Sequence, residues 1–191
     1  MIPRSLVPLL LAPLLLLASC ATDTAAEPPA AGPTSSGSGD ADADARVTGT
    51  ASRAAGTEVA AVYDFSGTTI DGGSFEGSSL QGAPAVLWFW APWCPTCRGQ
   101  VDGVTALAER HDGEVSVIGV GGLDDAGAIA DFAEEHDMGI PHLQDPDGAV
   151  WRHFGITAQS TYVVLDADGV VVAEGSLGDE ELAAEVAELV G

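Results

Sequence analysis

The sequence predicts an α/β fold, in which strands alternate with helices before a final hairpin and helix. Three observations indicate this class. The run 85–90 is apolar throughout, as expected of a strand covered on both faces, and apolar residues at helical spacing follow it. The segments 161–165 and 170–173 flank a turn sequence. A stretch with helical spacing, 179–190, then closes a chain of 191 residues, the usual size of one domain.

The N-terminal segment 1–19 has the pattern of a targeting sequence. Arg4 places a positive charge near the start, and residues 6–18 are apolar but too short to span a membrane comfortably. Small residues precede Cys20, and this pattern resembles a bacterial lipobox. The resemblance implies that Cys20 becomes the mature N-terminus, carries lipid and anchors the protein to the cell membrane, in an oxidising extracytoplasmic compartment. An ordinary secretory signal with an incidental cysteine is the alternative.

Residues 20–57 are expected to form a tether between this anchor and the domain. The segment is rich in alanine, proline, serine, glycine, threonine and aspartate, and it offers almost nothing to bury. Such a composition predicts disorder, and the expected role of the segment is to let the domain reach out from the membrane surface. The folded domain is expected over residues 58–191.

The first half of the domain surrounds two cysteines. Residues 61–65 alternate and predict a first strand, and a Gly/Ser-rich stretch follows. After the strand 85–90 and the cysteines, helical spacing continues to about Arg110. Residues 115–120 predict another buried strand.

The second half adds two helices before the hairpin. Asp124 or Asp125 can cap a helix that ends before Gly139. Asp147 is expected to open a short helix that Gly155 closes.

The hairpin and the last helix have local signals of their own. The sequence Asp-Ala-Asp-Gly at 166–169 predicts a turn, because it lacks the later glutamate of a calcium loop. In the helix 179–190, acidic residues occupy the first turn, where the helix dipole favours them. Its inward side is expected to hold Leu182, Val186 and Leu189.

The charge balance is strongly acidic. Six basic residues, all arginine, stand against 29 acidic ones, for a formal net charge of −23. This charge argues against nucleic-acid binding and against a polybasic membrane patch. It is typical of a soluble exported domain, with a preference for cationic partners as the alternative interpretation.

Cys94 and Cys97 lie between a strand and a helix, in the sequence Trp93-Cys94-Pro95-Thr96-Cys97. Pro95 suits the first helical position, which places Cys94 at the cap, facing unpaired N–H groups and the positive end of the helix dipole. That environment favours the thiolate. We therefore expect Cys94 to be the attacking thiol and Cys97 the resolving thiol of a redox pair.

Other uses of the cysteine pair are less well supported by the sequence. A closed zinc site needs four ligands, and the histidines show no ligand-like spacing; they are His111, His136, His142 and His153. For these reasons no metal is expected. No organic cofactor is expected either, because no glycine-rich nucleotide loop follows a strand at the right spacing.

The stretch 82–97 resembles the active-site segment of the thioredoxin superfamily, in particular its extracytoplasmic TlpA/ResA/DsbE-like branch. The resemblance extends over about 59–190. It implies a thioredoxin-like fold, with a central mixed sheet flanked by helices and an N-terminal strand extension. It also implies that Trp93, Pro95 and Thr96 tune the cysteines or contact the substrate.

The chain departs from this family at two positions. Where the family has a cis-proline beside the cysteines, this chain has Ser160. A cis bond before a non-proline residue costs about 2.5–4 kcal/mol, so the bond is either trans, with slight rearrangement, or cis under strain. A further interpretation is that Ser160 contacts the thiolate. Where the family has a glutamate, this chain has Gln100, which can hydrogen-bond but cannot act as a general base.

The sequence thus predicts a membrane-anchored extracytoplasmic thiol–disulfide oxidoreductase whose direction, oxidation or reduction, stays open. Its expected partners are cysteine-containing exported proteins or apocytochromes, and a membrane or soluble redox partner. One alternative is a copper-handling lipoprotein that uses Cys94, Cys97 and a histidine such as His153. The other is a thiol peroxidase, although the reactive-cysteine motif of that class is absent.

Overall fold

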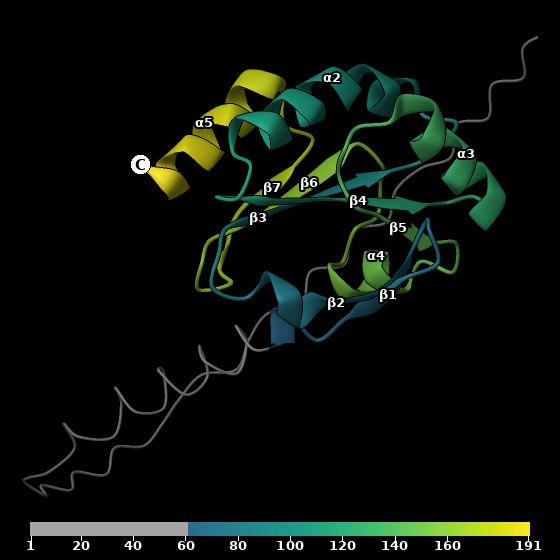
Figure 1. Cartoon of the computed structure of the whole chain (residues 1–191), viewed down its shortest axis with the longest axis horizontal. Coiled ribbons are helices and arrows are strands. Elements are labelled where there is room, and N and C mark those ends of the chain that lie inside the picture. The colour runs from purple at the N-terminus through teal and green to yellow at the C-terminus, as the bar shows by residue number, and fades with distance from the viewer. Residues whose placement is uncertain (1–60) are drawn as a thin grey trace, which may run out of the picture. The chain divides into compact units, whose positions relative to one another are not determined.

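The computed structural model describes residues 61–191, which form a seven-stranded mixed sheet with helices on both faces (Figure 1). The strand order is β2-β1-β5-β4-β3-β6-β7. The strands are β1 (Ser66–Thr69), β2 (Ser74–Glu76), β3 (Ala85–Trp90), β4 (Ser116–Gly122), β5 (His142–Asp145), β6 (Thr161–Leu165) and β7 (Val171–Gly175). The helices are a 3-10 turn η1 (Gly77–Leu80), α2 (Pro95–Arg110), α3 (Ala126–His136), α4 (Ala149–His153) and α5 (Asp179–Val190).

The centre of the sheet is parallel and its flanks are antiparallel. β3 pairs in parallel with β4, and β4 with β5, whereas β6 and β7 continue the sheet beside β3 in antiparallel fashion. On the other flank, β1 pairs with β5 and β2 with β1, both antiparallel. The predicted α/β class with a central mixed sheet and flanking helices is therefore confirmed.

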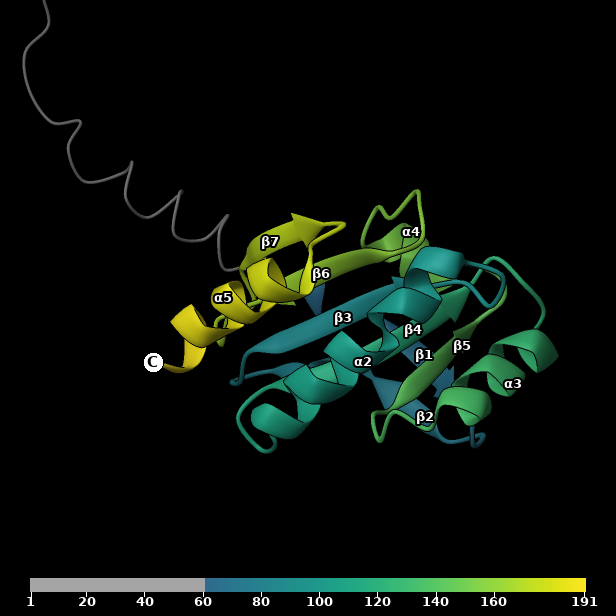
Figure 2. The same cartoon turned by 90° about the horizontal axis from the view of Figure 1, so that it is seen from above.

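Two apolar cores separate the helices by face. Helices α2, α3 and α5 pack on one face against Trp88 and Trp90 of β3. Helix α4 packs on the other face against Leu87 and Phe89, because successive side chains of a strand point to opposite sides. Figures 1 and 2 show α2 lying along the sheet next to α5. All six residues of β3 are buried, as the apolar run predicted.

Glycines in β4 make room for the aromatic residues on the first face. A Cβ on Gly121 would lie 2.5 Å from Ile129 Cγ2 and 2.8 Å from Trp90 Cζ2. Any side chain at this position would displace the α3 packing or the Trp90 ring. β4 thus lacks a side chain at the position where the Trp90 ring packs against it.

The start of the domain differs from the prediction. The predicted strand at 61–65 is wrong, since Ala61 and Val62 are helical and the chain then turns toward β1. Apolar residues alternate there because Tyr63 packs into the second core, not because the segment pairs in the sheet. The sheet is instead extended by the short polar strands β1 and β2, and β5 was also missed.

The short helix α4 begins differently as well. Asp147 was expected to open it, but Asp145 supplies the cap: its Oδ1 accepts from Ala149 N at 2.7 Å and its Oδ2 from Trp151 N at 2.9 Å. Asp145 can do this because it is the last residue of β5 and is buried against the helix start.

The other predicted elements are observed with small shifts at their ends. Asp125 caps α3, the turn 166–169 joins β6 to β7, and α5 spans the predicted residues. The proposed targeting segment 1–19, the lipidated Cys20 and the tether 20–57 lie outside the described residues. Within 61–191, no helix is long and apolar enough to span a membrane.

Candidate active site

The two cysteines occupy the first turn of α2, at the point where β3 delivers the chain to the helix. Cys94 is the N-cap residue and Pro95 the first helical residue. Cys94 Sγ accepts a hydrogen bond from the Cys97 N–H at 3.1 Å. An oxygen usually caps a helix in this way, so here sulfur replaces it at the positive end of the dipole.

The two thiols are chemically unlike although they are three residues apart. Both are free and buried, with Cys94 2% exposed and Cys97 fully buried. Burial raises the pKa of Cys97, with a further contribution from Cys94, to about 11. Burial also acts to raise the pKa of Cys94, but hydrogen bonds from Cys97, from Ser160 and from the backbone outweigh it and lower the pKa of Cys94 below its ordinary value.

Ser160 lies against both sulfur atoms. Its Oγ is 3.2 Å from Cys94 Sγ and 3.2 Å from Cys97 Sγ. No peptide bond in residues 61–191 is cis, and Ser160 has a left-handed backbone with φ of 65°. Of the alternatives for this position, the trans bond with a hydroxyl in contact with sulfur is the one observed.

Gln100 links the site to the sheet. Its Oε1 accepts from the Trp88 indole N–H at 2.9 Å, and its Nε2 donates to the Ser160 carbonyl at 3.4 Å. Gln100 is buried, whereas Asp102 is exposed. The amide therefore holds the Ser160 backbone and brings no charge to the cysteines.

The exposed side of the site carries two large apolar side chains, Trp93 and Leu123. Trp93 is 51% exposed, and its indole N–H donates to the Leu123 carbonyl at 3.2 Å. Leu123 is 49% exposed, and its backbone is left-handed with φ of 59°. Pro95 and Thr96 are also exposed. The role of Leu123 was not predicted, because Trp93 and Leu123 lie in different loops and no local sequence pattern links them.

Within residues 61–191, no histidine makes a hydrogen bond with Cys94 or Cys97. His153 Nε2 lies 3.0 Å from the Val62 carbonyl, and its ring packs on Phe65 and Phe154, which belong to the second core. Among residues 61–191, no group of three or more His, Cys, Asp or Glu side chains is placed to hold a metal ion.

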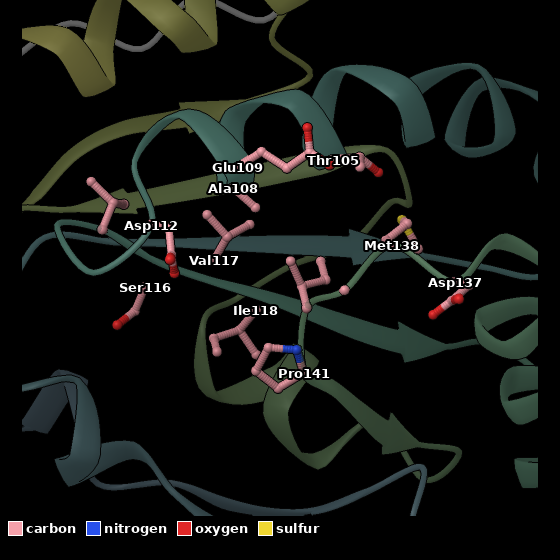
Figure 3. A pocket seen from close by; sticks show the side chains of 13 residues that line it. Thr105, Ala108, Glu109, Asp112, Ser116, Val117, Ile118, Asp137, Met138 and Pro141 are labelled. Atoms are coloured by element: carbon pink, nitrogen blue, oxygen red, sulfur yellow. The ribbon is translucent and has the colours of Figure 1, made fainter.

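A cavity of about 580 Å³ lies at the far end of α2, away from the cysteines. Figure 3 shows its apolar side chains, including Val117, Ile118 and Met138, with Glu109 and Asp112 beside them. At 1.5 Å per helical residue, Glu109 is roughly 20 Å along α2 from Cys94. This cavity is thus separate from the reactive sulfur atoms.

Known proteins are similar to this chain in sequence. Residues 54–190 match the family model described as Redoxin. The soluble secreted antigen MPT53 of Mycobacterium tuberculosis is 34% identical over 129 residues, which cover 65% of this chain and 74% of that protein. The thiol:disulfide interchange protein DsbE of Pseudomonas aeruginosa is 30% identical over 95 residues, 49% of this chain and 51% of DsbE.

Solved structures agree with these relatives. The structure of MTB dsbF in mixed oxidised and reduced forms superposes with a TM-score of 0.64 at 43% identity, covering 68% of this chain and 97% of that one. A secreted M. tuberculosis disulfide oxidoreductase homologous to E. coli DsbE superposes with a TM-score of 0.62 at 33% identity, covering 67% and 98%.

Fold and relatives together define the class: this is a thiol–disulfide oxidoreductase of the DsbE/ResA type with a thioredoxin-like fold. The chain belongs to the redoxin family.

Proposed function

We propose that this protein exchanges disulfides with cysteine-containing exported proteins through Cys94 and Cys97, while a lipid on Cys20 holds it at the outer side of the cell membrane. The observation that carries the chemical part is the sulfur cap of α2: Cys94 has backbone N–H donors and a lowered pKa, and Cys97 lies beside it with a raised one.

The mechanism follows from this asymmetry. The Cys94 thiolate attacks a disulfide of the partner, and a mixed disulfide forms as the other partner sulfur leaves. Cys97 then attacks Cys94 Sγ and releases the partner in reduced form. The reverse sequence oxidises a dithiol partner, and the reduction potential of the pair decides which direction prevails.

Substrate contact is assigned to the exposed apolar side of the site. Trp93 and Leu123 flank the cap with half-exposed side chains, and their hydrogen bond fixes the indole. Pro95 and Thr96 complete the exposed turn. Apolar contact of this kind suits the exposed, unfolded segments in which partner cysteines are accessible.

Two cysteine variants test the assignment of roles. Cys94→Ser is expected to abolish insulin reduction and oxidative refolding, because the nucleophile is gone. Cys97→Ser is expected to accumulate mixed disulfides with partners, seen as thiol-sensitive adducts on gels, because the second step is blocked. Full activity in Cys94→Ser would refute the assignment, and the opposite trapping pattern would exchange the two roles.

The anchor needs a separate experiment in cells that process lipoproteins. Wild-type protein is expected in the membrane fraction with an N-terminal mass increase, and Cys20→Ala in the soluble exported fraction. Equal partition of the two proteins would contradict lipid anchoring without affecting the proposed redox chemistry.

A further inference from the structure

One hydroxyl lies against both sulfur atoms of the site. Ser160 Oγ is 3.2 Å from each of Cys94 Sγ and Cys97 Sγ, and Ser160 is 6% exposed. A hydroxyl has one hydrogen to donate and two lone pairs, and its hydrogen rotates about the C–O bond to meet an acceptor. The same oxygen can therefore donate to either sulfur without any movement of the backbone.

The backbone that carries this hydroxyl is held in place. Ser160 has a left-handed φ of 65°, an uncommon conformation for a residue other than glycine. Its carbonyl accepts from Gln100, which is itself held by the Trp88 indole. The Ser160 side chain is thus mounted on a buried network that begins in β3 and ends at the sulfurs.

Among the described residues, no carboxylate contacts the two sulfur atoms. Gln100 presents an amide, and the nearby acid of the same helix, Asp102, is exposed. Tyr162 has a buried hydroxyl on the same core, but it makes no hydrogen bond within the described residues. Ser160 is therefore the side chain outside the pair whose hydroxyl contacts both thiols.

We propose, on the basis of the exchange function above, that the Ser160 hydroxyl stabilises the two thiolates in turn, donating to Cys94 while it is the nucleophile and to Cys97 once Cys94 is held in the mixed disulfide. In the mixed disulfide Cys94 carries no charge and no longer competes for the hydrogen. Cys97 then loses its proton to solvent, and its thiolate attacks Cys94 Sγ. The intramolecular S–S bond forms as the bond from Cys94 to the partner sulfur breaks. The partner sulfur leaves reduced, as a thiolate that takes up a proton from solvent, and the cysteine pair is left oxidised.

The charges around Cys97 agree with this timing. Burial raises the pKa of Cys97 most, and the Cys94 side chain adds to the rise, whereas Ser160 lowers it. Formation of the mixed disulfide removes the negative charge of Cys94 and leaves the Ser160 hydroxyl in place. The resolving thiol thus becomes easier to ionise at the step that uses it.

The test is rapid mixing of the full reduced chain, carrying Cys20→Ser to remove the third thiol, with a chromogenic aromatic disulfide over a range of pH. The first equivalent of aromatic thiol reports attack by Cys94, and the second reports resolution by Cys97. In Ser160→Ala, both phases are expected to slow about tenfold at neutral pH, and both pH midpoints to rise by about one unit, because a hydrogen bond to a charged group is lost.

Two further variants separate the hydroxyl from its surroundings. Ser160→Gly also lacks the hydroxyl but relieves the left-handed backbone that alanine keeps, so equal effects of the two variants identify the hydroxyl as the cause. Tyr162→Phe, the matched loss of a neighbouring hydroxyl, is expected to leave both phases unchanged.

The remaining outcomes overturn the proposal in distinguishable ways. A change in the first phase alone would mean that Ser160 serves only Cys94. Unequal effects of alanine and glycine would assign the change to the backbone. If the wild type releases both equivalents and no Ser160 variant changes either rate, the proposed role of Ser160 is overturned, whereas the exchange function is not. A wild-type chain that releases no second equivalent would contradict the exchange function itself.

Discussion

Trp88 and Trp90 lie on the same face of β3, but their indole N–H groups meet different surroundings. The Trp88 N–H donates to Gln100, and the chain of hydrogen bonds continues through Ser160 to both sulfurs. The Trp90 N–H makes no hydrogen bond within residues 61–191, although the ring stacks on Phe132 with centroids 4.5 Å apart.

The surroundings of Trp90 contain other polar atoms in the same condition. His142 lies edge-on to Trp90 with ring centroids 5.6 Å apart, and neither of its buried ring nitrogens makes a hydrogen bond within the described residues. A buried polar group left in this way costs about 1–3 kcal/mol. On this face of the sheet, the buried polar groups that position the sulfur atoms are hydrogen-bonded. Trp90 and His142 are not, and the fold bears the free-energy cost of their unpaired ring nitrogens.

The largest loss of stability at neutral pH is expected from breaking the hydrogen bonds that link Trp88, Gln100 and Ser160. Gln100→Leu leaves the Trp88 N–H and the Ser160 carbonyl buried without partners, and it should lower the free energy of unfolding by about 3 kcal/mol in urea titrations. The control is Gln81→Leu at an exposed position, where a change within about 0.5 kcal/mol is expected. Equal effects of the two variants would mean that the Gln100 bonds contribute nothing to stability.

The same contrast explains what could be predicted from the sequence. β3, the start of α2 and the span of α5 were predictable because each has a local signal: an apolar run, a proline after a cap, or acids before helical spacing. β1, β2 and β5 have no such signal, because they are short and partly polar and are defined by pairing with distant strands.

Prediction of the site was limited in a similar way. The cysteine cap was predictable from Pro95 at the first helical position, between an apolar strand and a stretch with helical spacing. The Ser160 position was found through a family resemblance, but its contact with both sulfurs depends on how β6 and α2 come together. The Trp93–Leu123 bond and the burial of His142 were missed, because both depend on tertiary packing of segments that no local pattern links.

A second effect, which appears only as the pH falls, is expected around Trp90 and His142, whose buried ring nitrogens make no hydrogen bond within the described residues. Burial lowers the pKa of His142 from 6.5 to about 4, so the folded protein binds fewer protons than the unfolded chain between these values. The contribution of His142 to the free energy of unfolding is therefore fully present above pH 6.5 and is lost as the pH falls toward 4. The total loss is about 3 kcal/mol.

Urea unfolding of the wild type and of His142→Phe, measured from neutral pH down to about pH 4, isolates this contribution, because other titrating groups are common to both proteins. The difference in unfolding free energy should shift in favour of the variant as the pH falls. Parallel curves for the two proteins would mean that His142 is protonated in the folded state without cost.

The smallest effect is expected where a polar atom is simply removed from the region without partners. Burial raises the pKa of Tyr162, with smaller contributions from Asp179 and Cys97, and its hydroxyl makes no hydrogen bond within the described residues. Tyr162→Phe keeps the ring and deletes that hydroxyl, so the free energy of unfolding should stay the same or rise by up to about 1 kcal/mol, since no bond is lost and a desolvation cost disappears. Thermal and urea unfolding of this variant measure the change directly. A loss of more than about 1 kcal/mol would show that the hydroxyl does have a partner in solution, and the contrast between the two buried regions would then shrink to Trp90 and His142.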